Sequence, residues 1–207
     1  MGGAKRAEVA DEALMTRYQR GDLSAFATLV SRHKTPLFNF ALRQLGSPTV
    51  AEDVVQDIFV RIIENAYSFK HESRFTTWAY TIARNLCVDH LRKASYRRHA
   101  PLDKKDESES GDGLSYGEQL SDPHPRASPE RGLAASEIQA RVLWAVDALP
   151  TEQKEVFLLR EVAHLAFREI ATITGAHENT VKSRMRYALE RLQEALTDFE
   201  QYARELR

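Results

Sequence analysis

The stretch LAFREIATITGAHENTVKSRMRYALERL, residues 165–192, decides the fold of the second half of the chain. It begins with a short helical pattern around the small residue Ala171 and turns at Gly175. After the turn, apolar residues recur three and four positions apart, which places them on one face of a second α-helix. Two helices joined by a short turn are the layout of a DNA-binding helix-turn-helix. An ordinary helical hairpin is the alternative interpretation.

The second helix of this stretch has two faces of different chemistry. Helical geometry places its apolar side chains within an arc of about 100°, and we expect this arc to be core: Val181, Met185, Ala188, Leu189, Leu192 and Leu196. The opposite face is polar, and Ser183, Arg186 and Tyr187 are expected to meet base edges, with Arg186 suited to guanine. Lys182 and Arg184 flank that face and are expected to hold phosphates.

The rest of the chain is also predicted to be helical, because it contains no convincing alternating strand pattern. Ser47-Pro48 and Ser128-Pro129 each place a capping residue before a proline at the first helical position, and Thr151 is a further N-cap candidate. Gly21, Gly46 and Gly175 lie where helices can stop. The predicted helices are 12–20, 24–45, 49–66, 76–96, 130–148, 152–161, 167–174 and 178–199.

Between the two helical segments lies a stretch of different composition. Residues 101–130 are rich in Gly, Pro and Ser, and their three bases and eight acids give a net charge of −5. This composition is typical of a linker. We therefore predict an all-α protein of two small helical domains, 11–99 and 129–200, joined by a flexible acidic linker over 100–128.

Composition excludes several functional classes. The 207 residues carry 29 basic and 30 acidic side chains, so any case for nucleic-acid binding depends on where the charges lie. The single cysteine, the absence of an apolar leader and the lack of a long apolar run predict a soluble cytoplasmic protein. The histidines are scattered and no phosphate-binding glycine loop is present, so we expect no catalytic residue, metal or cofactor.

The predicted helix 49–66 carries more apolar surface than one core requires. Its apolar residues cover an arc of about 220°, whereas a helix on a single core needs a stripe of about 100°. Asp53, Asp57 and Glu64 lie together at the edge of this arc. Two interpretations remain open: the helix offers an acidic-edged apolar strip to a partner, or it is a central helix buried on two sides of a bundle.

The segment after this helix combines aromatic and basic residues. An aromatic-rich loop, 67–75, precedes a helix in which Trp78, Ile82 and Leu86 are expected to form the core face. Asn85, Asp89, Arg92 and Tyr96 share another face, and 84–99 contains five bases against one acid, Asp89. Such a face suits DNA, above all single strands whose bases can enter a pocket. A merely solvated charged face is the alternative.

Four motifs, in this order and spacing, resemble a known family. They are AEDVVQDIF (51–59), FTTWAYTIARN (75–85), Leu149-Pro150 followed by EVFLLR (155–160), and EIA (169–171) followed by TVKSR (180–184). Their order and spacing span nearly the whole chain. The chain resembles the bacterial RNA polymerase sigma factors of the extracytoplasmic-function (ECF) group, which direct the polymerase to promoters.

The resemblance implies partners and surfaces. The helix 49–66 would dock on a coiled coil of the largest polymerase subunit, through Glu52, Asp53, Val54, Gln56, Asp57, Ile58 and Arg61. The loop and helix after it would read the minus-ten promoter element, with one base flipped into a protein pocket, through Phe69, Lys70, Arg74, Asn85, Asp89, Arg92, Lys93, Arg97 and Arg98. The helix-turn-helix would read the minus-thirty-five element through Asn179, Thr180, Lys182, Ser183, Arg184, Arg186 and Tyr187. An anti-sigma factor is a further expected partner.

Three features of this sequence limit what the resemblance implies about DNA contacts. Asn179 replaces a glycine that is common in the family, and Asn can cap a helix as well. Tyr187-Ala188-Leu189 replaces a common Arg-Ala-Arg, so the promoter preference does not transfer. Asp89 either accepts from a cytosine amino group or pairs with Arg92 or Lys93.

Two other functions compete with this interpretation. A free-standing DNA-binding regulator accounts for the helix-turn-helix but not for the partner strip of 49–66. A helical adaptor with solvated basic faces predicts no salt-dependent binding of nucleic acid.

Overall fold

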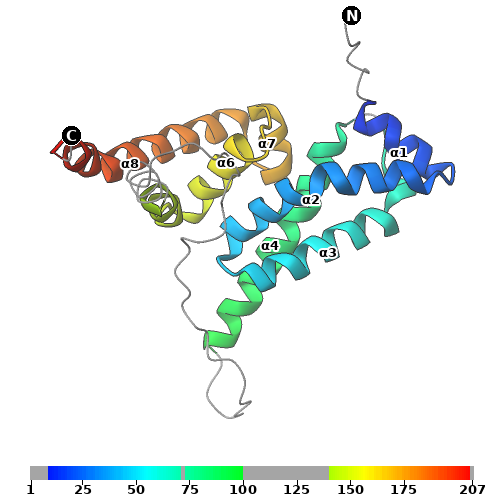
Figure 1. The fold of residues 1–207 in the computed structure, drawn as a ribbon, viewed down its shortest axis with the longest axis horizontal. Coiled ribbons are helices and arrows are strands. Elements are labelled where there is room, and N and C mark those ends of the chain that lie inside the picture. The colour runs from blue at the N-terminus through cyan, green and yellow to red at the C-terminus, as the bar shows by residue number, and fades with distance from the viewer. Residues whose placement is uncertain (1–8, 71–72, 100–139, 206–207) are drawn as a thin grey trace, which may run out of the picture.

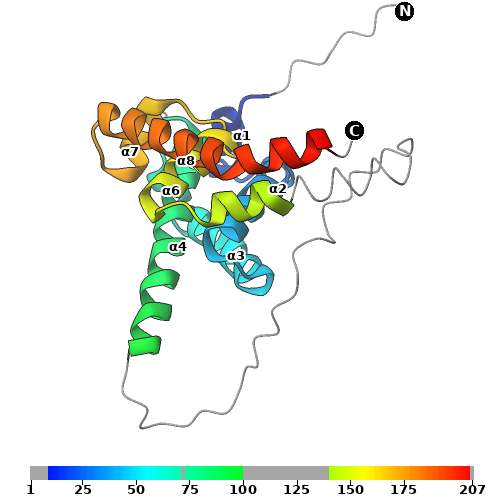
Figure 2. The ribbon, with the colours of Figure 1, turned by 90° about the vertical axis from the view of Figure 1, so that its left-hand side faces the viewer.

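The computed structural model describes residues 9–70, 73–99 and 140–205, and these are helical with short connections. They form two groups of helices, shown in Figures 1 and 2. The first group contains α1 (Asp11–Gln19), α2 (Leu23–Leu45), α3 (Pro48–Glu64), the 3-10 helix η1 (Ala66–Ser68) and α4 (Phe75–His99). The second contains a helix over 140–147, α6 (Thr151–Glu161), α7 (Phe167–Thr174) and α8 (Glu178–Glu205). The predicted all-α class is confirmed.

Local signals explain where several helices begin and end. Ser47 caps α3, since its Oγ accepts from the Val50 N–H at 3.5 Å, and Pro48 occupies the first helical position. Gly46 and Gly175 follow α2 and α7 with φ of 72° and 68°, the left-handed conformation that favours glycine. Asp22 caps α2, and hydrogen bonds from Ser24 and Arg17 lower the pKa of its carboxyl to about 2. Asp22 was not identified from the sequence as the N-cap of this helix.

Some predicted boundaries differ from the structure. Thr151 is the first residue of α6, and Pro150 holds the capping position, so the prediction of Thr151 as N-cap is wrong. The helix predicted over 49–66 ends at Glu64, because a 3-10 turn follows. The helix predicted over 130–148 is described only from residue 140, and Ser128, Pro129 and the linker lie outside the described residues.

The first group packs around α2, α3 and α4. Val54, Ile58 and Ile62 of α3 are fully buried, so α3 is a central helix with most of its apolar arc inside the bundle. On α4 the buried apolar side chains are Phe75, Ala79, Tyr80, Ala83 and Cys87. The prediction that Trp78, Ile82 and Leu86 form the core face is therefore corrected, since these three are only partly buried. α4 carries two apolar stripes, and the stripe that contains Phe75, Tyr80 and Cys87 lies against the bundle.

The second group buries the predicted inner face of the helix-turn-helix except at Leu189 and at Leu196, which is only partly buried. Val181, Met185, Ala188 and Leu192 of α8 are buried against α6 and α7. Leu189, predicted to be core, is 49% exposed, because α6 and α7 cover only one side of α8 at this turn. Ala188, one residue before it, is the side chain that α7 and α6 enclose.

The two groups contact one another through α4 with α7 and through α2 with α6. Their buried apolar side chains form one continuous cluster. The last turns of α4 project beyond the other helices, as Figures 1 and 2 both show, and residues 92–96 are exposed there. This places a basic helix end in solvent beside the bundle.

Candidate nucleic-acid interface

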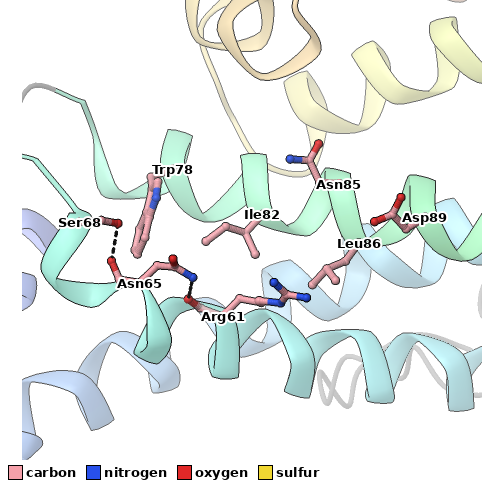
Figure 3. Close-up of a pocket in the computed structure, with 8 residues that line it drawn as sticks. All are labelled: Arg61, Asn65, Ser68, Trp78, Ile82, Asn85, Leu86 and Asp89. Carbon is pink, nitrogen blue, oxygen red and sulfur yellow. Dashed lines mark hydrogen bonds between the residues drawn. The ribbon is translucent and has the colours of Figure 1, made fainter.

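A pocket of about 330 Å³ lies between α3 and α4, next to the turn at η1 (Figure 3). Its walls combine apolar and polar groups: Trp78, Ile82, Asn85, Leu86 and Asp89 from α4, and Arg61, Asn65 and Ser68 from the end of α3 and the turn. The volume falls within the range of small-ligand sites, at its lower end. An indole wall with amide, carboxylate and guanidinium groups offers both stacking and hydrogen bonding, which are the contacts that a flipped base needs.

The turn that forms one end of this pocket is held by its own hydrogen bonds. The Asn65 Nδ2 donates to the Arg61 carbonyl at 2.8 Å, and the Ser68 hydroxyl donates to the Asn65 carbonyl at 2.7 Å (Figure 3). Gln19 of α1 donates to the Ala66 carbonyl at 2.8 Å and ties the turn to the bundle. The pocket wall is thus fixed before any ligand arrives.

Four residues of the minus-ten prediction are accessible along α4: Asn85, Arg92 and Lys93 are exposed, and Asp89 is partly exposed. Asn85 and Asp89 line the pocket one helical turn apart, and Arg92 and Lys93 follow toward the projecting end. Asp89 accepts from Arg92 at 3.0 Å, in an ion pair whose side chains are 50% and 78% exposed. Of the two roles considered for Asp89, the structure therefore shows the ion pair with Arg92. Such an exposed ion pair contributes little free energy, so it can break when a ligand binds. The side chains of Arg97 and Arg98 lie outside the described residues.

The loop before α4 differs from the prediction at one position. Phe69 is 5% exposed and packs against Trp78 and Phe75, with ring centroids 5.1 Å and 6.1 Å away. It therefore supports the pocket wall and cannot present its ring to DNA. Lys70 is exposed. Arg74 is also exposed, and its guanidinium lies 3.8 Å from Glu169 of α7.

The polar face of α8 is accessible. Asn179, Thr180, Lys182, Ser183, Arg186 and Tyr187 are exposed, and Arg184 is half-buried beside α6. Glu178 pairs with Lys182 at 2.6 Å, which lowers the pKa of the Glu178 carboxyl. Arg186 lies 3.7 Å from Glu190 and stacks its guanidinium over the Tyr187 ring at 4.9 Å. These ion pairs are exposed and therefore weak, so Lys182 and Arg186 can leave them for DNA at a small cost in free energy.

The outward face of α3 carries acids and two apolar side chains. Glu52, Asp53, Gln56 and Asp57 are exposed there, so they are accessible to a partner. Val54 and Ile58 are fully buried, so neither can contact a partner, and the prediction that they do is wrong. Val60 and Ile63, which the prediction left out, are 49% and 45% exposed. Their spacing of three residues on one face is the signal that would have identified them.

Arg61 also differs from its predicted place. It was assigned to the partner surface of α3, but it lines the pocket together with the α4 side chains (Figure 3). Asn65 and Ser68 also line the pocket although no sequence pattern singles them out, and Trp78, which was expected to be core, lines it as well. Their role depends on the packing of α3 against α4, which no local pattern contains.

Two further observations limit the chemistry of the described residues. No three His, Cys, Asp or Glu side chains among them gather in a way that could hold a metal ion. No helix within the same residues is long and apolar enough to cross a membrane.

A helix-turn-helix and a helical bundle with an exposed basic helix end are the layout of a DNA-binding protein. Its residues 29–97 match the family model of sigma-70 region 2, and residues 139–192 match that of sigma-70 region 4.

Sequence relatives match this chain over most of its length. The RNA polymerase sigma-H factor of Pseudomonas aeruginosa is 32% identical over 186 residues, covering 90% of this chain and 93% of that protein. The ECF RNA polymerase sigma-E factor of Haemophilus influenzae is also 32% identical, over 90% of this chain and 95% of its own length. The sigma factor RpoE of Bartonella quintana, solved in complex with the anti-sigma factor NepR, superposes with a TM-score of 0.62 at 25% identity, over 83% of this chain and 96% of that one.

The chain belongs to the ECF sigma factors. It directs RNA polymerase to promoters for the initiation of transcription, and a free-standing regulator is not favoured.

Proposed function

We propose that this sigma factor divides promoter recognition between its two groups of helices, with domains over 11–99 and 129–200. The first group binds core polymerase and opens the minus-ten element, and the second binds the minus-thirty-five element as duplex. The observation that carries this division is the pocket between α3 and α4, because a preformed pocket suits one flipped base and has no use on intact duplex.

The minus-ten element is read at this pocket. Trp78 offers a ring for stacking, and Asn85 offers both a donor and an acceptor to a base edge. Asp89 accepts from the exocyclic amino group of a base once Arg92 releases it, and Arg92 then turns to a phosphate. Arg61 brings a cation to the α3 side of the pocket, where the backbone of the extruded nucleotide approaches.

The minus-thirty-five element is read by α8 in the major groove. Ser183, Arg186 and Tyr187 face outward in its first turns, which is where a recognition helix contacts base edges. Lys182 and, after it leaves Glu152, Arg184 contact phosphates on the two sides of the groove.

Core polymerase binds on the outward face of α3. Glu52, Asp53, Gln56 and Asp57 share the exposed face of α3 with Val60 and Ile63, which lie one to two turns further along, so the surface combines acidic and apolar side chains. A partner of matching chemistry presents apolar side chains among basic ones. We propose the coiled coil of the largest polymerase subunit as that partner.

An anti-sigma factor is proposed as a second partner. The superposition on a sigma factor solved with its anti-sigma factor supports this assignment. The anti-sigma factor is expected to cover the α3 face that polymerase uses, so that the two partners exclude one another.

Promoter binding with and without core polymerase tests the proposed function. With core polymerase, the full chain is expected to bind a promoter that carries both elements, and binding weakens steeply with salt. Without polymerase, duplex binding is expected to be weak. Specific, tight duplex binding by the chain alone, unchanged by core polymerase, would contradict the proposal.

A further inference from the structure

None of the surfaces proposed so far for polymerase or DNA includes α1 (Asp11–Gln19), and the match to sigma-70 region 2 begins only at residue 29. Two polar side chains at opposite ends of α1 nevertheless reach far along the sequence. Gln19 and Glu12 form hydrogen bonds with backbone atoms 47 to 63 residues away. These atoms belong to the turn after α3 and to the start of α4, the two segments that meet at the pocket.

The Gln19 side chain holds the turn that forms one end of the pocket. Its Nε2 donates to the Ala66 carbonyl at 2.8 Å and to the Phe69 carbonyl at 3.3 Å, so one amide group joins the two ends of this turn. A side-chain amide has two N–H donors, which is the number that two carbonyls require. Asn65 and Ser68, which line the pocket, belong to the same turn.

The Glu12 side chain holds the start of α4. Its Oε1 accepts from the Phe75 backbone N–H at 2.8 Å. Phe75 is the first residue of α4, and the N–H groups of a first helical turn have no carbonyl partner in their own helix. A carboxylate there satisfies the donor and also interacts favourably with the positive end of the helix. Glu12 therefore fixes the start of the helix that carries Trp78, Asn85 and Asp89.

An aromatic cluster connects these two hydrogen-bonded segments to the indole wall of the pocket. Trp78 packs against Phe69 and Phe75, with ring centroids 5.1 Å and 6.1 Å away, and both phenyl rings are buried. Gln19 binds the Phe69 carbonyl, and Glu12 binds the Phe75 N–H. The two rings that support the indole thus belong to the two residues whose backbones α1 holds, so the position of the indole depends on α1.

α1 is itself fixed on α2. One carboxylate oxygen of Asp11 accepts from Arg32 at 2.7 Å, and the other lies 2.7 Å from the His33 Nε2. The side chains of Asp11 and His33 are only 19% and 12% exposed, so water screens their contact less than it screens a surface pair. The His33 ring lies 5.1 Å from the Phe75 ring. The start of α1 is therefore held on the same bundle that supports the pocket.

We propose that α1 is a brace for the pocket, in which Gln19 and Glu12 are positioning residues that set how strictly the pocket selects the extruded base. They act through the spacing between the Trp78 indole and the turn with Asn65 and Ser68. Walls of fixed spacing reject a base that leaves hydrogen-bonding groups unpaired, whereas walls that move adapt to several bases. This inference rests on the proposed function for the ligand of the pocket, but not for the brace itself.

Fluorescence of Trp78 tests the brace without polymerase or DNA. The chain has two tryptophans, so Trp144→Phe, at an exposed position, leaves Trp78 as the single reporter. In this background Gln19→Glu, which has the same shape but no donor, is expected to increase the quenching of Trp78 by acrylamide. Ala13→Gln is the matched control at an exposed position of α1, and it is expected to leave the quenching unchanged.

Glu12 offers a matched pair of variants. Glu12→Gln keeps an oxygen that accepts from the Phe75 N–H and is expected to behave like the wild type, whereas Glu12→Leu has no acceptor and is expected to increase the quenching of Trp78. Unchanged quenching in Gln19→Glu or in Glu12→Leu, with unchanged helix content by circular dichroism, would overturn the brace. If a variant loses helix content, hydrogen exchange of the wild type decides. A protected Phe75 amide supports the brace, and exchange as fast as that of an unbonded first-turn amide overturns it.

Base selection is measured with core polymerase on a promoter at which the chain initiates, with the minus-ten element held open by mismatches. Each non-template position of that element carries each of the four bases in turn, and the wild type is expected to prefer one base at one position. Gln19→Glu and Glu12→Leu are expected to reduce this preference several-fold, while Glu12→Gln retains it and the affinity for core polymerase stays unchanged.

Two outcomes of the base-selection experiment separate the brace from the proposed function. Increased quenching of Trp78 with an undiminished base preference would overturn the positioning role of Gln19 and Glu12. A wild type that prefers no base at any minus-ten position would contradict the proposed function of the pocket, whereas the quenching results would still decide whether α1 braces it.

Discussion

Arg184 of α8 donates to Glu152 of α6 at 2.5 Å, so a cation on the DNA-facing helix is neutralised before DNA arrives. Glu152 is 69% exposed and contributes negative charge at the same edge. Its replacement by glutamine is expected to tighten promoter binding several-fold at low salt, with the gain fading at high salt. Fluorescence anisotropy at several salt concentrations measures this. Glu161→Gln, at the end of the same helix, is the control, and equal affinity of Glu152→Gln and wild type would contradict the assignment of Arg184.

Substitutions of Arg186 and Lys182 are expected to affect DNA binding in different ways. Arg186→Ala should cost about 1–3 kcal/mol on the preferred minus-thirty-five sequence and relax the preference at one base pair. Lys182→Ala should weaken all sequences alike and lower the salt slope by about 1. Binding to a library of single-base promoter variants separates the two patterns. If Arg186→Ala leaves the sequence preference intact, α8 does not read bases with this residue.

Asn85→Ala is expected to impair the opening of the minus-ten element more than the binding of a promoter that is already open. The reason is that Asn85 lines the pocket that we propose for the extruded base. Permanganate footprinting of unpaired thymines measures opening, and an artificially mismatched minus-ten promoter provides the comparison. His90→Ala, on the same helix but away from the pocket, is the control. An equal loss on matched and mismatched promoters would point to a role in duplex binding.

Cys87 is expected to make folding stability fall at alkaline pH. Burial, and next Glu155, raise its pKa to about 12 in the folded protein, above the ordinary value of 9.0. A pKa raised on folding stabilises the fold fully below the unfolded value, and this contribution is lost as pH rises toward the folded value. Between pH 9 and 10 the wild type should lose more stability than Cys87→Ala, by up to about 1.4 kcal/mol. Urea unfolding at both pH values measures the difference, and parallel losses would contradict the burial of the thiol.

Local sequence signals account for much of the fold. Ser47-Pro48 marks the start of α3, Gly175 marks the turn of the helix-turn-helix, and the apolar spacing from Val181 predicts most of the buried face of α8. These features depend on a few neighbouring residues, so a pattern suffices to find them.

The misplaced residues share a different cause. α4 has two apolar stripes, and only the packing of α3 and α2 against it decides that Tyr80 and Cys87 are core while Trp78 lines a pocket. Arg61 belongs to the pocket for the same reason. Val54 and Ile58 were expected on a partner surface, because the apolar arc of α3 has no mark that separates its buried side from its exposed one. The contact of Glu155 with Arg84 joins residues 71 positions apart and has no local signal at all.

Run-off transcription with purified core polymerase tests the central claim most directly. The wild-type chain is expected to make core polymerase start at defined genomic promoters, and Ile63→Asp, which places a charge at the apolar part of the α3 face, is expected to reduce these transcripts strongly. Leu23→Asp, an equally polar change at an exposed leucine of α2, should leave them unchanged. We predict specific transcripts with the wild type and with Leu23→Asp, but not with Ile63→Asp. If core polymerase makes the same unspecific products with and without the wild-type chain, the account is contradicted.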